Sequence, residues 1–161
     1  MSSRFNVKSN LTRRSLVAGA GLWLAAPAIV RAAGQNGVAL VIGNAKYLWE
    51  SPLPNVKRDV TDVAKRLQEI GLKTELVQDA SRATMRAAVE KFKSAAAGAD
   101  FALFYYAGHG ASWDRNYYIV PVDIDLSTPD AVKNLQNVTE ISDAIKDAAH
   151  KLLIFDSCRN N

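Results

Sequence analysis

The chain has 161 residues, 48% hydrophobic and 22% charged, which is the composition of a single globular domain and excludes a disordered or fibrous protein. Its one cysteine excludes an internal disulfide, and no Cys/His cluster is present that would hold structural zinc. The net charge of +4 comes from the first 32 residues, which hold five of the 20 basic residues and no acid, so we expect no basic face for nucleic acid.

Residues 1–32 have the pattern of an export signal. Arg13 and Arg14 precede an apolar run at 16–30, which is shorter than the ~20 residues that span a bilayer comfortably. Small residues follow, and we expect a signal peptidase to cut after Ala32. The arginine pair resembles a bacterial twin-arginine signal, which predicts a periplasmic or secreted protein with no membrane contact in its mature form. The alternatives are an uncleaved anchor and an ordinary signal with a chance arginine pair.

Beyond residue 33, predicted strands and helices alternate. Residues 37–43 are a continuous apolar run, which is typical of a strand buried on both faces. Residues 55–70 carry apolar side chains at steps of three and four, which predicts a helix with one buried face that ends at Gly71. Residues 72–77 form a second, short strand.

The second half of the chain continues the alternation and ends on a strand. The predicted elements are a helix at 81–97 capped by Ser81, a strand at 100–106, an extended piece at 117–120, a helix that begins at Thr139 and runs to 149, and a strand at 151–155. This order predicts an α/β fold in which a mostly parallel sheet has helices on both faces. The stretch 108–134 has little helix, and connections of that length are often functional.

Two chemically active side chains follow predicted strands. His109 stands between two glycines just past the strand at 100–106, and Cys158 comes soon after the strand at 151–155. The interval of 49 residues between them holds one loop, one helix and one strand, so we expect the two strands to be neighbours. A thiol needs a nearby base to react at neutral pH, and histidine supplies one. The alternatives are a structural histidine and a cysteine that serves as a small apolar side chain.

Two other enzyme classes lack their signatures. No glycine-rich phosphate loop follows the strand at 37–43, which argues against a nucleotide-binding domain. No Gly-x-Ser-x-Gly segment occurs, which argues against an α/β serine hydrolase. The second histidine, His150, precedes the last strand and is expected at the surface.

The segments around His109 and Cys158 resemble the caspase–metacaspase family of cysteine peptidases. The matching residues are Tyr105-Tyr106-Ala107-Gly108-His109-Gly110 and Asp156-Ser157-Cys158-Arg159-Asn160-Asn161. The resemblance covers residues 37–161. It implies that residues 33–161 form a three-layer α/β/α caspase-like sandwich with a mostly parallel sheet. It also implies a domain truncated after the nucleophile motif, without the family's C-terminal strands.

The resemblance assigns a role to each residue of the predicted site. Cys158 is the nucleophile, His109 is the acid and base, and the backbone N–H groups of Gly110 and Cys158 hold the oxyanion. No third catalytic residue, cofactor or metal is expected, and the substrates are proteins or peptides. Because Arg159 and Asn160 stand where metacaspases commonly have His-Ser-Gly after the nucleophile, calcium dependence does not carry over.

Asp156 is predicted to set the specificity. Animal caspases, which cut after Asp, carry Gln at this position, whereas metacaspases carry a carboxylate, as here. A carboxylate attracts a cationic side chain, so we expect a cysteine endopeptidase that cuts after Arg or Lys. Alternatively, Asp156 caps a loop or pairs with Arg159. The alternative function is a catalytically silent caspase-like module that binds a protein partner.

Overall fold

The computed structural model describes residues 36–157 and the backbone of residues 159 and 160. The predicted signal at 1–32, with its cleavage position after Ala32, lies outside the described residues, and so does Cys158.

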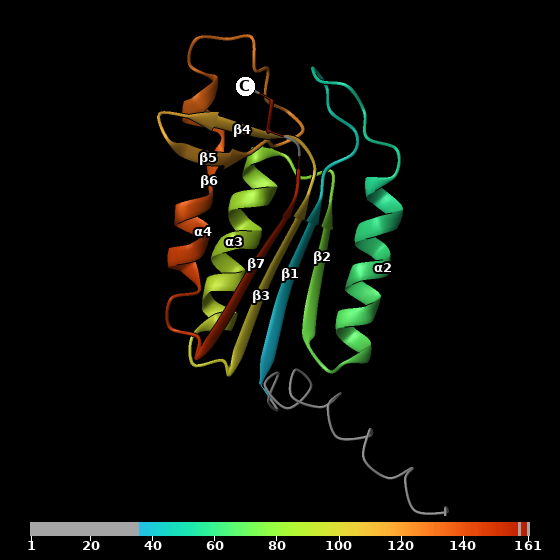
Figure 1. Ribbon diagram of the computed structural model, residues 1–161, viewed down its shortest axis with the longest axis vertical. Coiled ribbons are helices and arrows are strands. Elements are labelled where there is room, and N and C mark those ends of the chain that lie inside the picture. Colours follow the sequence, from blue (N-terminus) through green and yellow to red (C-terminus); the bar gives the residue numbers. More distant parts are fainter. Residues whose placement is uncertain (1–35, 158, 161) are drawn as a thin grey trace, which may run out of the picture.

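The main sheet has four parallel strands in the order β2-β1-β3-β7 (Figure 1). They are β1 (Gly37–Gly43), β2 (Lys73–Gln78), β3 (Phe101–Ala107) and β7 (His150–Asp156). All four correspond to predicted strands. The expectation that the third and last of them are neighbours is confirmed, because β3 pairs with β7 along its whole length.

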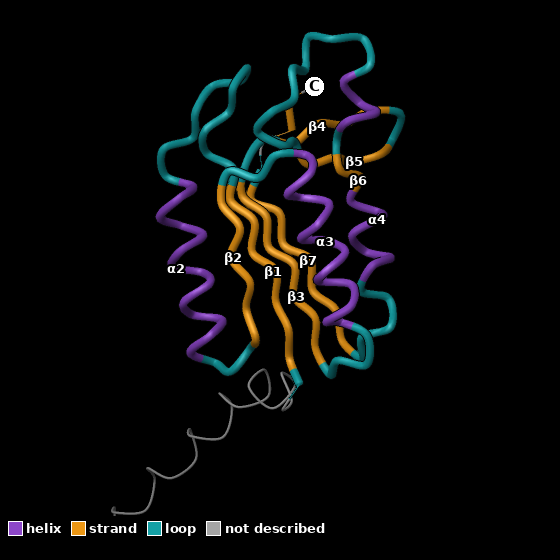
Figure 2. The backbone as a smooth tube through the Cα atoms, turned by 180° about the vertical axis from the view of Figure 1, so that it is seen from behind, coloured by secondary structure: helices purple, strands orange, loops and turns teal. Residues whose placement is uncertain are grey.

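Helices cover both faces of this sheet, which confirms the three-layer α/β/α arrangement (Figure 2). The helices are α2 (Val56–Glu69) on one face and α3 (Arg82–Ala96) and α4 (Val138–Ala144) on the other. Val60 and Ala64, one turn apart on α2, are buried against Val41 of β1. This is the apolar stripe that the sequence predicted, and it fixes α2 beside the centre of the sheet.

Adjacent tyrosines of β3 point to opposite faces of the sheet. Tyr106 lies in the core shared with α3 and α4, together with Phe104. Tyr105 packs on the α2 side, together with Leu103. Successive side chains of a strand alternate between faces, so the two tyrosine hydroxyls reach two different environments beyond the same strand end.

A second, smaller sheet stands beyond the carboxyl ends of the main strands, where the sequence predicted only an extended piece at 117–120. It holds β4 (Gly110–Trp113), β5 (Asn116–Ile119), β6 (Gln136–Asn137) and β8 (Arg159–Asn160), in the order β6-β5-β4-β8, with the 3-10 turn η1 (Ala131–Asn134) before β6. Asp114 and Arg115, with φ angles of 46° and 62°, form a two-residue hairpin turn between β4 and β5. Such turns are usually marked by Asn-Gly or Asp-Gly. Asp-Arg stands here instead, so no signal in the sequence predicts the hairpin.

The third helix is shorter than the expected 139–149 and begins at a different cap. The side chain of Asn137 accepts a hydrogen bond from the N–H of Thr139 at 2.8 Å, so Asn137 caps α4 and Thr139 does not. The N–H of Ala149 donates to the carbonyl of Ala99 at 3.0 Å. Residues just before β7 are thus already paired with the approach to β3, and this pairing replaces the last helical turns.

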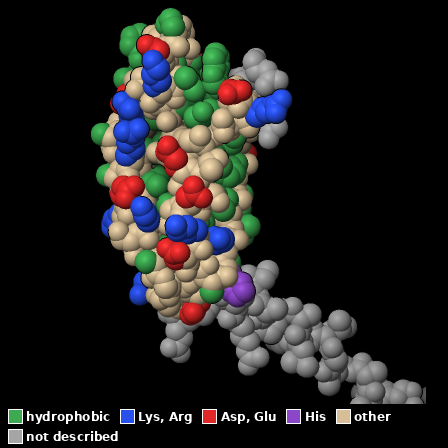
Figure 3. All heavy atoms as spheres, turned by 90° about the vertical axis from the view of Figure 1, so that its left-hand side faces the viewer, with side chains coloured by type: hydrophobic (Ala, Val, Ile, Leu, Met, Phe, Trp, Pro, Cys, Tyr) green, Lys and Arg blue, Asp and Glu red, His purple; other side chains and the backbone are tan. Residues whose placement is uncertain are grey.

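The outer surface over α3 and α4 mixes charges of both signs (Figure 3). A groove of about 530 Å³ between these helices is lined by Arg86, Lys93, Lys146, Glu90, Glu140 and Asp143, together with Val89, Gln136 and Ala144. Within residues 36–157, no group of three or more His, Cys, Asp or Glu side chains is arranged to hold a metal ion. In the same part of the chain, none of the helices has the length and apolar character needed to span a bilayer.

Candidate active site

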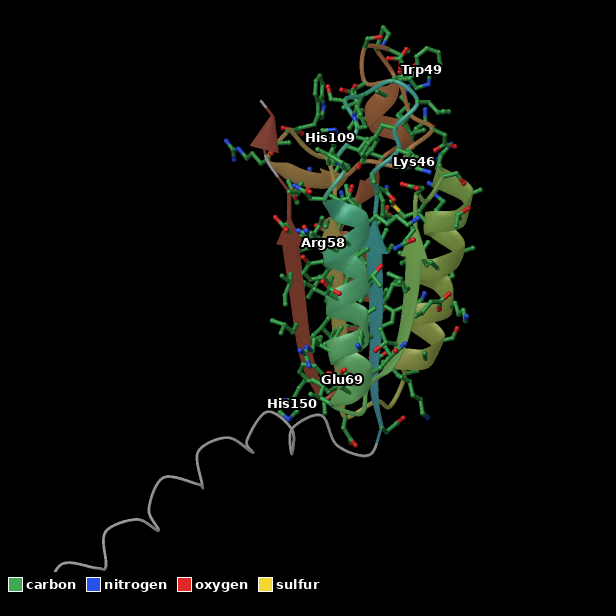
Figure 4. The ribbon with its side chains drawn as sticks, turned by 90° about the vertical axis from the view of Figure 1, so that its right-hand side faces the viewer. Lys46, Trp49, Arg58, Glu69, His109 and His150 are labelled. Carbon is green, nitrogen blue, oxygen red and sulfur yellow. The ribbon has the colours of Figure 1, made fainter. Side chains whose placement is uncertain are left out.

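His109 and Asp156 lie at the carboxyl ends of two neighbouring parallel strands. β3 ends at Ala107, two residues before His109, and β7 ends at Asp156. Ala107 is paired directly with Asp156, whose carbonyl accepts a hydrogen bond from the N–H of Gly108 at 3.3 Å. His150 is exposed at the opposite end of the sheet, as expected (Figure 4). The predicted residues therefore share the edge where parallel sheets bind ligands.

Two buried tyrosines hold the backbone of His109 from both sides. The N–H of His109 donates to the Tyr47 hydroxyl at 2.8 Å, and the Tyr106 hydroxyl donates to the carbonyl of His109 at 2.8 Å. The two hydroxyl oxygens are 3.2 Å apart, so Tyr47 donates in turn to Tyr106. Burial raises the pKa of Tyr47 and raises that of Tyr106 well above its usual value, so both hydroxyls keep their protons.

Gly108 allows the tyrosines to approach this closely. Its φ is +156°, a conformation that residues with a side chain rarely adopt. A Cβ at this position would lie 2.5 Å from the Tyr106 hydroxyl oxygen and 2.6 Å from that of Tyr47. Because both hydroxyls are engaged by His109, neither is free to move aside. The glycine before the histidine is therefore required by the hydrogen bonds as well as by the turn.

The ring of His109 has a fixed orientation and a fixed tautomer. Its Nε2 lies 2.8 Å from the backbone carbonyl oxygen of Ser51, and the Tyr47 ring packs against it with centroids 4.5 Å apart. A carbonyl can only accept, so Nε2 carries the proton and Nδ1 is the basic nitrogen. The sequence predicted no side chain that would orient the histidine. The hydrogen-bond partner of the ring is a backbone carbonyl, and nothing in the sequence marks it because every residue has one.

Asn44 ties together the segments that carry these groups. It is fully buried at the end of β1, where its N–H donates to the carbonyl of Ala107 at 2.9 Å. Its side-chain Nδ2 donates to the carbonyl of Val120, and its Oδ1 accepts from the N–H of Ala80, both at 2.8 Å. Each of these polar atoms is thus satisfied, and the connection that leads to Tyr47 leaves the sheet in a fixed direction.

Gly110 and Ser157 both lie against the side chain of Tyr117. The Tyr117 hydroxyl is hydrogen-bonded to the Oγ of Ser157, and its ring stands edge-on to Phe155 with centroids 5.7 Å apart. A Cβ on Gly110 would collide with the same hydroxyl and would lie 2.8 Å from the ring carbon that bears it. Gly110 also pairs with Arg159 across β4 and β8. The described neighbours of position 158 on both sides therefore lie at the start of β4.

Asp156 shares the α2 side of the sheet with Asp59 and Tyr105. Asp156 is exposed, whereas Asp59 is half-buried in the first turn of α2 and lies 3.3 Å from the neighbouring Arg58. Burial raises the pKa of Tyr105, and the charges of Asp156 and Asp59 raise it further, so both carboxylates act on one hydroxyl. Asp59 was not predicted as a site residue, because its relation to Asp156 depends on how α2 crosses the sheet. The suggested pairing of Asp156 with Arg159 lies outside the described side chains.

Comparison with known proteins identifies the family. Residues 36–161 match the sequence profile of the caspase domain. The chain is 30% identical over 128 residues to the mucosa-associated lymphoid tissue lymphoma translocation protein 1 of Homo sapiens, and 32% identical over 129 residues to its Mus musculus homologue. Each comparison covers 78% of this chain but only 15% of the relative, so the chain spans a small part of these proteins. The chain belongs to the caspase-domain family of cysteine peptidases.

Proposed function

We propose that this chain is the catalytic domain of a cysteine endopeptidase that uses His109 and Cys158 to cut peptide bonds after Arg or Lys. The observation that carries the proposal is the setting of His109, whose backbone is held by two tyrosines and whose Nε2 is engaged by the Ser51 carbonyl. This arrangement leaves Nδ1 as a base. Asp156 ends the strand next to β3, and Cys158 follows it by two residues in the sequence.

In the proposed reaction, Nδ1 of His109 removes the thiol proton of Cys158, and the thiolate attacks the scissile carbonyl. The N–H groups of Gly110 and Cys158 stabilise the oxyanion, and the loss of one such donor typically costs about 3 kcal/mol. The imidazolium then protonates the leaving amine as the C–N bond breaks and a thioester remains. Water then gives a proton to the same nitrogen and adds to the thioester, the C–S bond breaks to release the carboxylic acid, and the imidazolium returns its proton to the thiolate.

The Ser51 carbonyl acts on this reaction through His109. While the imidazole carries both protons, the carbonyl accepts the Nε2–H and stabilises the positive charge. It also keeps the ring from rotating, so Nδ1 stays directed toward the reacting atoms. A backbone carbonyl thereby does the work that a carboxylate does in serine–histidine–aspartate enzymes.

Preference for Arg or Lys is supported by the two carboxylates on the α2 side. The charges of Asp59 and Asp156 both act on the hydroxyl of Tyr105 and raise its pKa. An arginine or lysine side chain placed among these three groups would form charge-assisted hydrogen bonds. The surface pair between Asp59 and Arg58, with side chains 41% and 74% exposed, is weak enough for a substrate cation to replace Arg58.

Fluorogenic peptides that end in Arg, Lys or Asp test the proposal. We expect the protein to cleave the Arg and Lys peptides and to spare the Asp peptide. Cys158→Ala removes the chain's one cysteine and should abolish cleavage. The two histidines form a matched pair, because His150 is exposed at the opposite end of the sheet. His109→Ala should lower kcat about 100-fold or more, whereas His150→Ala should leave it unchanged.

The outcomes separate the parts of the proposal. Cleavage after Asp would keep the enzyme but would contradict the roles of Asp59 and Asp156. Full activity in Cys158→Ala or in His109→Ala would contradict the catalytic pair. A folded parent protein that cleaves none of the peptides would favour the catalytically silent module.

A further inference from the structure

The connection between β1 and α2 carries two prominent apolar side chains. Leu48 is 71% exposed and Trp49 is 64% exposed, more than any other large apolar residue in the described part of the chain. They are adjacent in the sequence, and Trp49 stands at the tip of the connection, above His109 and at the active-site end of the sheet (Figure 4). Apolar surface left in water on a soluble domain often marks a binding site.

The backbone of this connection is anchored on both sides of the pair. The N–H of Leu48 donates to the carbonyl of Val122 at 2.9 Å, and the N–H of Leu53 donates to the carbonyl of Ala45 at 2.9 Å. Before the pair, one carboxylate oxygen of Asp79 accepts hydrogen bonds from two consecutive N–H groups, those of residues 45 and 46, at 2.9 Å each. The exposed side chains therefore sit on a fixed backbone.

Side chains on either side of the pair point inward. Tyr47 and Leu53 pack with Val120 and Val122 in a small apolar cluster under the connection. With its neighbours used in this way, the connection turns Leu48 and Trp49 outward. The two side chains are therefore held in solvent by the backbone, although an apolar cluster lies directly under the connection.

The same connection touches the proposed catalytic base at two points. The ring of Tyr47 packs on the ring of His109, and the carbonyl of Ser51 accepts from its Nε2. Leu48 and Trp49 lie between these two contact residues in the sequence. The connection therefore borders the imidazole ring that, in the proposed reaction, gives its proton to the leaving amine.

We propose that Leu48 and Trp49 form a subsite for an apolar side chain of the substrate, in the first two residues after the scissile bond. This inference rests on the proposed peptidase function. His109 gives its proton to the leaving amine, so the segment that departs with this amine runs along the histidine side of the site. The carboxylates that attract the Arg or Lys lie on the α2 face of the sheet, in the first turn of α2 and at the end of β7.

Internally quenched peptides test the subsite. Each carries Arg before the scissile bond and either Leu-Leu or Ser-Ser directly after it. We expect the parent protein to cleave the Leu peptide with a kcat/KM about tenfold above that of the Ser peptide, because burying part of two apolar side chains stabilises the complex by that much. In Trp49→Ala and in Leu48→Ser with Trp49→Ala, the ratio should fall toward one.

Trp113 provides the matched control. It is 63% exposed, similar to Trp49, but it ends β4, which runs away from the β1–α2 connection (Figure 1). Trp113→Ala should keep the tenfold ratio. Thermal unfolding of all variants should match the parent, because each substitution removes an exposed side chain.

A peptide with Arg joined directly to aminocoumarin separates this inference from the proposed function. A parent protein that cleaves it but shows a Leu-to-Ser ratio near one would overturn the subsite and leave the peptidase intact. A tenfold ratio that persists without Leu48 and Trp49, or that Trp113→Ala removes equally, would also overturn it. A parent protein that cleaves no Arg peptide at all would overturn both.

Discussion

Tyr105 and Tyr106 are neighbours on β3, but their hydroxyls belong to two different parts of the candidate site. One part consists of buried hydrogen bonds and the other of charged side chains. Tyr106 is fully buried, and its hydroxyl belongs to the hydrogen bonds that hold His109. Tyr105 is half-buried on the other face, where its hydroxyl lies among the charges of Asp156 and Asp59. The tyrosine hydroxyls that hold His109 are buried and uncharged, whereas Asp156 on the other face is exposed and charged.

This difference predicts that substitutions in the two parts have different effects on stability and on activity. A buried polar group that loses its partner costs roughly 1–3 kcal/mol, so changes on the histidine side should destabilise the fold as well as the activity. Exposed charge pairs contribute only about 0–1 kcal/mol to folding, so changes on the carboxylate side should leave stability nearly unchanged and alter selectivity.

Gly108→Ala should have the largest effect. The new methyl group would meet the hydroxyls of Tyr47 and Tyr106 at a φ of +156°, so we expect a loss of about 3 kcal/mol of unfolding free energy, measured in urea, and loss of activity. Gly98→Ala is the control: its φ is +72° and nothing lies within 4 Å of its Cβ, so only backbone strain of about 1 kcal/mol is added. Equal losses in both variants would show that the tyrosines do not constrain Gly108.

Asp59→Asn and Asp156→Asn should each lower kcat/KM for an Arg peptide about tenfold, and together about a hundredfold, because each removes a charge-assisted hydrogen bond. Melting temperatures should stay close to that of the parent protein. Glu69→Gln is the control, since Glu69 ends α2 at the far end of the sheet from His109 (Figure 4). A large loss of stability in either Asn variant, with selectivity kept, would assign these carboxylates to the fold.

In Tyr106→Phe, the free energy of unfolding should fall less steeply with pH in the alkaline range than in the parent protein. The pKa of Tyr106 is raised by burial, so above pH 10 the unfolded chain releases this proton while the folded protein retains it. Stability is therefore complete below about pH 10 and falls as pH rises, by about 1.4 kcal/mol per pH unit for each such tyrosine. Urea unfolding between pH 9 and pH 11 measures the slope. An identical slope in Tyr106→Phe would mean that this hydroxyl ionises as readily in the folded protein.

Tyr117→Phe and Ser157→Ala should show a smaller, coupled effect. Their hydrogen bond joins β5 to the residue before Cys158, so we expect a coupling energy of about 1 kcal/mol in a double-mutant cycle of urea unfolding. Additive effects of the two substitutions would indicate that the hydroxyls contribute independently.

Much of the main sheet was predictable because its signals are local. The continuous apolar run at 37–43 and the helical stripe at 55–70 match β1 and α2 closely. The single crossover between the last two strands predicted that β3 and β7 are neighbours, and this is confirmed. The pairing of Ala107 with Asp156 brings the end of β7 to the edge where His109 lies, whereas the predicted position of Cys158 lies outside the described residues. The family was identified from the two motifs at the ends of these strands.

The rest depends on contacts that the sequence does not mark. The β4–β5 hairpin was missed because Asp114 and Arg115 adopt positive φ without a glycine. The Ser51 carbonyl was missed because a backbone acceptor has no signature, and Asp59 was missed because its partner in the site comes from a strand almost a hundred residues later. Tertiary structure, not local pattern, brings these groups to the site.

Alkylation of the chain's one cysteine tests the central claim most directly, that His109 acts as the base for Cys158. A free thiol, with a pKa of about 8.5, is mostly protonated at pH 7 and reacts slowly with iodoacetamide. We predict that the parent protein and His150→Ala react at pH 7 about tenfold faster than His109→Ala, and that the difference vanishes above about pH 9, where any thiol is ionised. Equal rates in the parent and in His109→Ala across this pH range would contradict the claim.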